Sequence, residues 1–230
     1  MIADLAWDAL GAELDAAGRA VIPSLLDADQ CRAIAGRYGD DARFRSRVVM
    51  ANHGYGRGEY RYFAYPLVDV VATLRTVLYP PLAVIANRWH EALGLDVRFP
   101  DDHAAFLARC HAAGQLRPTP LLLQYGPGDY NRLHQDRYGE HVFPLQVAVL
   151  LSAPGRDFTG GELVLTEQRA RMQSRADVVP LGQGDAVIFA VHHRPVPSRR
   201  GVARAIVRHG VSALRSGHRH TLGIIFHDAA

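Results

Sequence analysis

Apolar residues recur every three or four positions through the first third of the chain. This spacing predicts an amphipathic helix over residues 3–18 and a second long helical stretch over residues 67–93. We expect the second stretch to be interrupted at Pro80-Pro81, because proline lacks a backbone donor and clashes with the preceding turn. Residues 43–65, rich in Arg, Tyr and Gly, predict a strand, a loop and another strand.

A capping box is predicted between these segments. Asp27 precedes an apolar helical pattern and Gln30 stands three residues later, so a helix is expected to begin there and end near Tyr38. Val21-Ile22-Pro23, just before it, predicts a short extended segment.

The pattern changes near Pro118, where short apolar runs begin to alternate with Gly/Pro turns. Such a succession of short strands predicts a sandwich or barrel. The runs are residues 121–123, 145–151, 162–165, 186–189, 206–207 and 221–226. We therefore predict an α+β fold and a single domain over residues 1–230. Residues 1–117 would form a helix-rich supporting part that packs on one sheet of the 118–230 core.

Composition narrows the class of protein. A hydrophobic content of 48% suits a globular domain with a real core. No run approaches the eighteen or so apolar residues of a membrane span, and the N-terminus lacks a secretory pattern. Cys31 and Cys110 are too few for a disulfide framework, so we expect inert thiols in a reducing, cytoplasmic compartment.

All 26 basic residues are arginine, and the formal net charge is +3. A GC-rich coding bias explains this composition most simply. The alternative is phosphate recognition, because the planar guanidinium suits phosphate geometry. The sequence pI near 9.1 permits a polyanionic partner without requiring one.

The tripeptide His134-Gln135-Asp136 carries the first chemical signal. In a strand, residues i and i+2 point to the same side, so both side chains could reach one metal ion. Alone, the tripeptide favours a surface loop with two polar residues. With a distant histidine it would complete the 2-His-1-carboxylate face that is diagnostic of non-haem Fe(II) oxygenases.

Two histidines compete for the third position. His193 and His209 each have a glycine eight residues later, but the tenth position is Ala203 in one case and Arg219 in the other. A strong apolar strand follows Arg219 only. This ending, with the Tyr, Pro/Gly-turn and His-x-Asp order from Tyr125 onward, resembles the Fe(II)/2-oxoglutarate dioxygenases over residues 118–230. His209 is therefore our choice as ligand.

The resemblance implies a double-stranded β-helix (jelly-roll) core and the cofactors Fe(II), 2-oxoglutarate and O2. It further implies metal ligation by His134, Asp136 and His209. Arg219 and Thr221, on one side of a strand, would grip the distal carboxylate of 2-oxoglutarate. Tyr125 would contact the same co-substrate; core packing of its ring remains an equal alternative.

Two further segments invite a role. The turn Gly160-Gly161 before Glu162 resembles the family and is expected to matter for backbone geometry, without catalysis by Glu162. Residues 167–175 fall outside the shared core and read as a solvated hairpin tip. Alternatively, the tip anchors an anionic substrate such as a nucleic-acid backbone. Its arginines are Arg169, Arg171 and Arg175. His193, a pocket-lining or structural residue, is a further candidate for substrate contact.

The substrate is left between three hypotheses. The lead-in to His134 resembles AlkB-type demethylases, which favours repair of alkylated, single-stranded DNA. The ten-residue interval from His209 to Arg219 resembles prolyl hydroxylases, which favours a peptidyl or small-molecule hydroxylase. A non-enzymatic barrel is the third, opposed by the intact ligand set. We place repair first. Whether residues 43–65 close over the pocket, and the oligomeric state, stay open.

Overall fold

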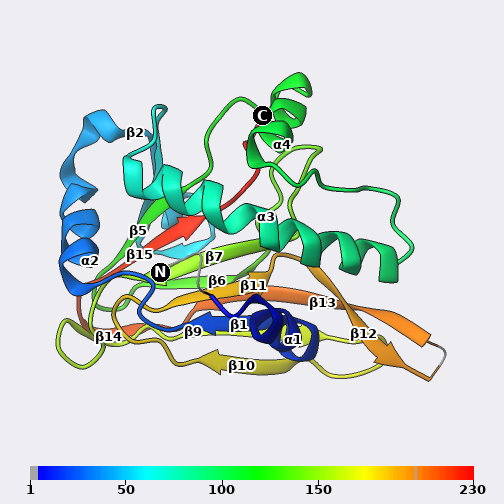
Figure 1. The fold of residues 1–230 in the computed structure, drawn as a ribbon. Helices are drawn as coiled ribbons and strands as arrows, with labels where there is room; N and C mark the ends of the chain where they lie inside the picture. Colours follow the sequence, from blue (N-terminus) through cyan, green and yellow to red (C-terminus); the bar gives the residue numbers. More distant parts are fainter. Residues whose placement is uncertain (1–4, 200) are drawn as a thin grey trace.

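The computed structural model describes residues 5–199 and 201–230. Two antiparallel sheets face each other, and helices pack on the outer side of the larger sheet (Figure 1). The larger sheet contains, in spatial order, β1 (Arg19–Ile22), β11 (Ala186–Ala190), β7 (Leu145–Leu150), β15 (Arg219–Ile224), β5 (Leu121–Tyr125), β4 (Glu59–Phe63) and β2 (Phe44–Val49). This mixture of helices and facing antiparallel sheets confirms the predicted α+β jelly-roll class.

The smaller sheet forms the opposite wall. Its strands are β10 (Arg175–Val179), β9 (Leu163–Gln168), β13 (Gly201–Val211), β6 (Tyr130–His134) and β3 (Gly56–Arg57), with β12 (His193–Ser198) also paired to β13. A separate ribbon joins β14 (Leu214–Gly217) to β8 (Phe158–Gly160). Leu165 of β9 and Phe189 of β11 belong to one buried cluster, so apolar side chains bridge the two sheets.

The first two helices begin and end close to the predicted positions. Helix α1 spans Trp7–Ala17, and the first residues of the predicted 3–18 segment lie outside the described part of the chain. Helix α2 (Ala28–Ala35) continues into a 3-10 turn, η1 (Gly36–Gly39). Its capping box is confirmed: Asp27 Oδ1 accepts from the Gln30 amide at 2.8 Å, and Gln30 Oε1 accepts from the Asp27 amide at 3.0 Å.

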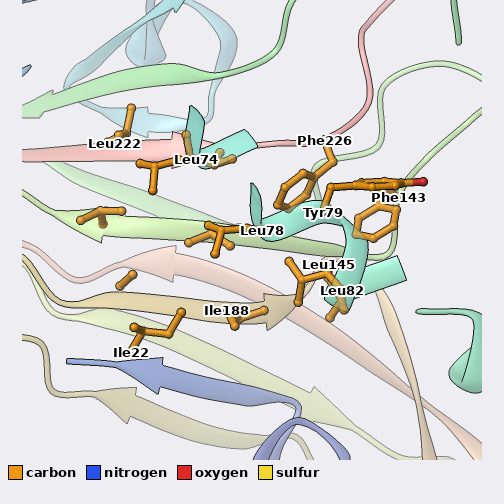
Figure 2. Close-up of a cluster of buried hydrophobic side chains, with 14 of the residues drawn as sticks. Ile22, Leu74, Leu78, Tyr79, Leu82, Phe143, Leu145, Ile188, Leu222 and Phe226 are labelled. Carbon is orange, nitrogen blue, oxygen red and sulfur yellow. The ribbon is translucent and has the colours of Figure 1, made fainter. Parts of the chain in front are cut away.

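The predicted interruption at Pro80-Pro81 is wrong, because helix α3 runs unbroken over Asp69–Ala92. Leu78, Tyr79 and Leu82, on either side of the prolines, have no exposed surface. Figure 2 shows these side chains packed over Leu145, Ile188 and Leu222 of the larger sheet. Burial of several large apolar side chains, each worth about 1.5–3 kcal/mol, offsets the hydrogen bonds that the prolines remove.

Helix α3 is also long and apolar enough to cross a membrane by length and composition, with a mean hydropathy of 1.3 over its best window. Half of that window is buried inside the protein. The packing in Figure 2 is that of a core helix of a globular domain.

The remaining elements complete the frame. Helix α4 (His103–Ala112), which the sequence pattern did not predict, packs beside α3, and its Phe106 lies parallel to Tyr79 with ring centroids 5.5 Å apart. The 3-10 turns η2 (Asp41–Arg43) and η3 (Met50–His53) flank β2. Thus residues 43–65 form the predicted strand, loop and strand. Both cysteines are free and buried, and burial raises the pKa of Cys31 to about 11.

Candidate metal centre and co-substrate site

A cavity of about 400 Å³ opens between the two sheets. The larger sheet contributes Gln146, Arg219 and Thr221 to its wall, and the smaller sheet contributes His134 and His209. The three residues of the predicted metal group and the three of the predicted co-substrate group all line this one cavity. They are His134, Asp136, His209, Arg219, Thr221 and Tyr125.

The histidines meet because their strands are paired. His134 is the last residue of β6 and lies directly opposite His209 in β13, with ring centroids 4.2 Å apart. Asp136 approaches both rings: His134 Nε2 is 3.4 Å from Oδ1 and His209 Nε2 is 3.2 Å from Oδ2. One ligand atom from each residue lies within 4.8 Å of the others, which suits a single metal ion.

The prediction that one strand carries both His134 and Asp136 is wrong. Strand β6 ends at His134, so Asp136 stands in the following loop and not on the strand. The i, i+2 rule therefore does not bring the two ligands together. The loop does so, because the side-chain amide of Gln135 donates to the carbonyls of Val207 at 2.7 Å and His192 at 3.2 Å.

The protonation states fit a metal ion. The His134 Nδ1–H donates to the Arg132 carbonyl at 2.7 Å, so Nε2 is the ring nitrogen that faces Asp136 and is placed to bind a metal ion. Burial would raise the pKa of the Asp136 carboxyl, but His209 and His134 outweigh it and hold the pKa well below its usual range. Burial lowers the pKa of His209. A buried carboxylate anion beside two imidazole nitrogens is a donor set that a divalent cation would neutralise.

Two neutral side chains hold this carboxylate in place. Tyr138 Oη donates to Asp136 Oδ1 at 2.7 Å, and Gln146 Nε2 donates to Oδ2 at 3.0 Å. Neither Tyr138 nor Gln146 was predicted from the sequence as a site residue. Gln146 could have been noticed in the sequence, because it is the single polar residue in the apolar run 145–151.

Arg219 is a buried cation without a counter-ion. Its side chain is 3% exposed, and none of the described carboxylates forms an ion pair with it. Nη1 donates to Thr221 Oγ1 at 2.6 Å, and Nε has no partner among the described residues. Because a buried charge is costly unless it is paired, a carboxylate ligand would complete this arrangement. Arg219 and Thr221 thus fit the distal end of a dicarboxylate such as 2-oxoglutarate.

Tyr125 combines a packed ring with an unpaired hydroxyl. Its ring is fully buried, packs with Phe158 and lies 5.6 Å from the Arg219 guanidinium carbon. Its hydroxyl has no hydrogen-bond partner among the described residues and lines the cavity next to Arg219. The structure therefore shows a core residue whose polar end is free for a ligand.

The Gly-Gly turn shapes the wall behind Arg219. Gly160 and Gly161 have φ values of 73° and 64°, which L side chains rarely adopt. A Cβ on Gly161 would lie 2.5 Å from Leu214 Cδ1 and 3.2 Å from Arg219 Cδ. The predicted backbone role of this turn follows from these contacts. Glu162 is engaged elsewhere, accepting from Arg215 at 3.2 Å.

The four predicted substrate residues lie outside the cavity wall. Arg169 and Arg171 occupy the turn between β9 and β10, and Arg175 begins β10. Arg169 Nε pairs with Glu167 at 2.8 Å, which engages it within the protein. His193 begins β12, against His192, and is discussed below.

Comparison with known proteins supports this chemistry. Residues 58–229 match the model of a family described as "Oxygenase, catalysing oxidative methylation of damaged DNA". Two Mycobacterium tuberculosis sequences, from strains CDC 1551 / Oshkosh and ATCC 25618 / H37Rv, are each 48% identical over 200 residues. In both cases the match covers 85% of this chain and 86% of the relative, which carries the name of an uncharacterized protein.

Solved structures share the fold. A Pseudomonas putida prolyl-4-hydroxylase is 17% identical with a TM-score of 0.55, covering 97% of this chain and 99% of that one. A 2OG-Fe(II) oxygenase family oxidoreductase from Burkholderia pseudomallei is 15% identical with a TM-score of 0.59, covering 99% and 94%. At these identities the likeness concerns the fold alone.

The family match makes this chain an oxygenase, and its fold is that of solved 2OG-Fe(II) oxygenases. The His-Asp-His group fits Fe(II), and the unpaired Arg219 beside Thr221 fits 2-oxoglutarate, which together with O2 are the cofactors expected from the sequence. The chain belongs to the family of oxygenases described above as acting on damaged DNA. The match begins at residue 58, well before the 118–230 region in which the sequence resemblance was seen.

Proposed function

We propose that this protein removes alkyl groups oxidatively from damaged, single-stranded nucleic acid. In this proposal His134, Asp136 and His209 hold the iron, Arg219 and Thr221 bind 2-oxoglutarate, and Tyr125 contacts it. The observation that carries the proposal is the match to a family described as acting on damaged DNA, in a chain whose cavity contains these six residues.

The cavity suits a planar, uncharged or cationic ring. Tyr55, Tyr60, Tyr125, Tyr138 and Phe189 contribute to its wall. Asp136 is the only carboxylate among the described residues that line it. Aromatic rings stack on a nucleobase whatever its sequence, and they attract the positive charge that alkylation places on a ring nitrogen.

The mouth suits an unstacked base as well. Tyr55 is 50% exposed at the rim, and His53 stacks on it with centroids 5.3 Å apart and an interplanar angle of 22°. The backbone of Tyr55 is fixed to the metal-ligand strand, because its carbonyl accepts from the Arg132 amide at 2.8 Å. Enzymes that act on a base must extrude it or take it from a single strand, and exposed aromatic rings stabilise it once it is unstacked.

The proposed reaction divides the two atoms of O2 between 2-oxoglutarate and the alkylated base. The bound Fe(II) supplies the activation of O2. One oxygen atom enters 2-oxoglutarate, which becomes succinate and CO2, and the other enters an N–CH3 group, which becomes N–CH2OH. That hydroxymethyl group leaves as formaldehyde and restores the N–H of the base. The protein residues orient the two substrates and exclude bulk water, and Arg219 neutralises the distal carboxylate within the cavity.

A single-stranded oligonucleotide with one N-methylated base tests the proposal. We expect mass spectrometry to show loss of the methyl group, with one formaldehyde released for each base restored. The His209→Ala protein is the control and should give neither product. Turnover of 2-oxoglutarate that DNA does not stimulate, with an unchanged oligonucleotide, would contradict repair and move the search to peptides and small molecules.

A reducing compartment remains part of the proposal. Cys31 and Cys110 are both buried and free, and burial raises the pKa of each thiol, so neither is poised for disulfide exchange. This supports the cytoplasmic location expected from the cysteine count.

A further inference from the structure

Four basic side chains gather beside the metal-ligand loop, and we call them the β12 cation cluster: Arg137, His192, His193 and Arg204. Arg137 directly follows Asp136. The rings of His192 and His193, at the start of β12, lie 4.5 Å apart. In the β12–β13 pairing, Arg204 stands opposite Pro195, two positions along the strand from His193.

This cluster has no internal counter-charge. Arg137 and Arg204 are exposed, and neither forms an ion pair with a carboxylate of the described residues. Burial first, and then the neighbouring His193 and Arg137, lower the pKa of His192 to about 3. Burial, Arg204 and Arg137 also lower the pKa of His193. Arg137 and Arg204 bring two positive charges to these rings, so the region attracts anions.

The hairpin tip of residues 167–175 is the alternative anion site predicted from the sequence. Arg169, in the turn after β9, is paired with Glu167 at 2.8 Å, and Glu167 also pairs with the buried Arg194. That carboxylate neutralises part of the charge of the turn and ties it to the β-sheet. Arg171 and Arg175 of the same hairpin tip are exposed and form no ion pair among the described residues, as is true of Arg137 and Arg204, so the choice between the two regions depends on which of them adjoins the cavity wall.

The cluster is also adjacent to the active site. Gln135 lines the cavity, and its side-chain amide donates to the backbone carbonyl of His192 at 3.2 Å. The side chain of Gln135 thus contacts both the cavity and the backbone of the cluster. His192 Nδ1 is buried and has no hydrogen-bond partner among the described residues, so this nitrogen is available to a ligand.

We propose that the β12 cation cluster binds the phosphate backbone of the single strand whose base enters the cavity. The inference rests on the proposed function and assigns its strand-binding surface. Arg137 and Arg204 supply planar guanidinium groups that match phosphate oxygens, and His193 supplies a further donor. These contacts position the strand and read no sequence, whereas the cavity selects the base.

The test measures binding of a fluorescent, unmodified oligo-dT strand by anisotropy over a series of salt concentrations. Each phosphate contact on single-stranded nucleic acid contributes about 0.7 to the slope of log K against log salt. For Arg137→Ala/Arg204→Ala we expect the slope to fall by about 1.4, with at least tenfold weaker binding at low salt. Arg137→Lys/Arg204→Lys should keep the slope, because it keeps the charges.

A matched control is the double variant Arg171→Ala/Arg175→Ala at the hairpin tip, which removes the same net charge. We expect it to leave the slope within 0.7, about one phosphate contact, of the wild-type value. Thermal unfolding of each variant verifies folding. Equal slopes for wild type and Arg137→Ala/Arg204→Ala would overturn this inference alone, provided that the wild type binds DNA. Failure of the wild-type protein to bind any single strand would overturn the proposed function as well.

Discussion

Replacing Arg219 by methionine should separate ligand binding from stability. Methionine keeps much of the volume of the side chain and removes the charge. Truncating one partner of a buried, hydrogen-bonded charge pair costs about 2–5 kcal/mol, so 2-oxoglutarate should bind roughly 30-fold to several-thousand-fold more weakly. The free protein should lose little stability, because Arg219 is 3% exposed and no described carboxylate pairs with it.

Arg75 provides the matched control. It is equally buried, but its Nη2 pairs with Asp228 Oδ1 at 2.7 Å, and both side chains are almost fully enclosed. Arg75→Met would remove the one permanent cation beside the buried Asp228 carboxylate and leave it with Tyr65 and His111 alone, at a cost of about 3–5 kcal/mol of unfolding free energy. A functional cation and a structural cation should therefore respond in opposite ways to the same substitution.

Two measurements on the same samples decide the matter. Equilibrium dialysis of 2-oxoglutarate against metal-loaded protein under argon gives the affinity, and urea unfolding of the free protein gives the stability. We expect Arg219→Met to lose affinity and keep stability, and Arg75→Met to lose stability. Wild-type affinity for 2-oxoglutarate in folded Arg219→Met protein would refute the assignment of this residue.

Three other predictions follow from single contacts. Gln146→Leu or Tyr138→Phe should weaken Co(II) binding by about 10–100-fold, because each removes a hydrogen bond that orients the Asp136 carboxylate. Titration of Co(II) under argon measures this affinity. Unchanged affinity in both variants would show that the carboxylate needs no such support. Gly56→Ala should lower the melting temperature, because its Cβ would lie 2.3 Å from the Tyr130 carbonyl oxygen. Gly36→Ala should not, because Gly36 has a helical φ of −62° and open space around it. Equal melting temperatures for the two variants would contradict the close approach of β3 and β6. Burial and then Arg75 lower the pKa of His103 to about 4, below its value near 6.5 in the unfolded chain. Neutral His103 therefore contributes fully to the free energy of unfolding above pH 6.5, and this contribution is lost as the pH falls toward 4. Urea unfolding at pH 7.5 and 5 should show that His103→Asn reduces this loss of stability, and an identical pH dependence in both proteins would exclude His103 as its source.

The sequence predicted features that depend on local chemistry. The capping box of Asp27 and Gln30 needs only neighbouring residues, and the structure forms it. Grouping His209 with His134 required a resemblance, because 75 positions separate them in the chain, and the β6–β13 pairing places them opposite each other. The offset from His209 to Arg219 likewise placed the guanidinium in the same cavity.

Features set by tertiary packing were not predicted. The prolines of α3 cost local hydrogen bonds, and only the burial of Leu78, Tyr79 and Leu82 on the sheet offsets that cost. The support of Asp136 by Gln146 comes from the opposite sheet, so no spacing in the sequence reveals it. The lack of a carboxylate partner for Arg137 and Arg204 depends on which acidic side chains fold beside them.

Succinate production is the most direct test of the central claim that this chain is a 2-oxoglutarate-dependent oxygenase built on His134, Asp136 and His209. Protein loaded with Fe(II) without oxygen would be mixed with 2-oxoglutarate and N-methylated single-stranded DNA, and succinate measured after O2 is admitted. We predict DNA-stimulated succinate from the wild type and none from folded His209→Ala protein. Equal succinate from both proteins, or no bound iron in the wild type, would contradict the account.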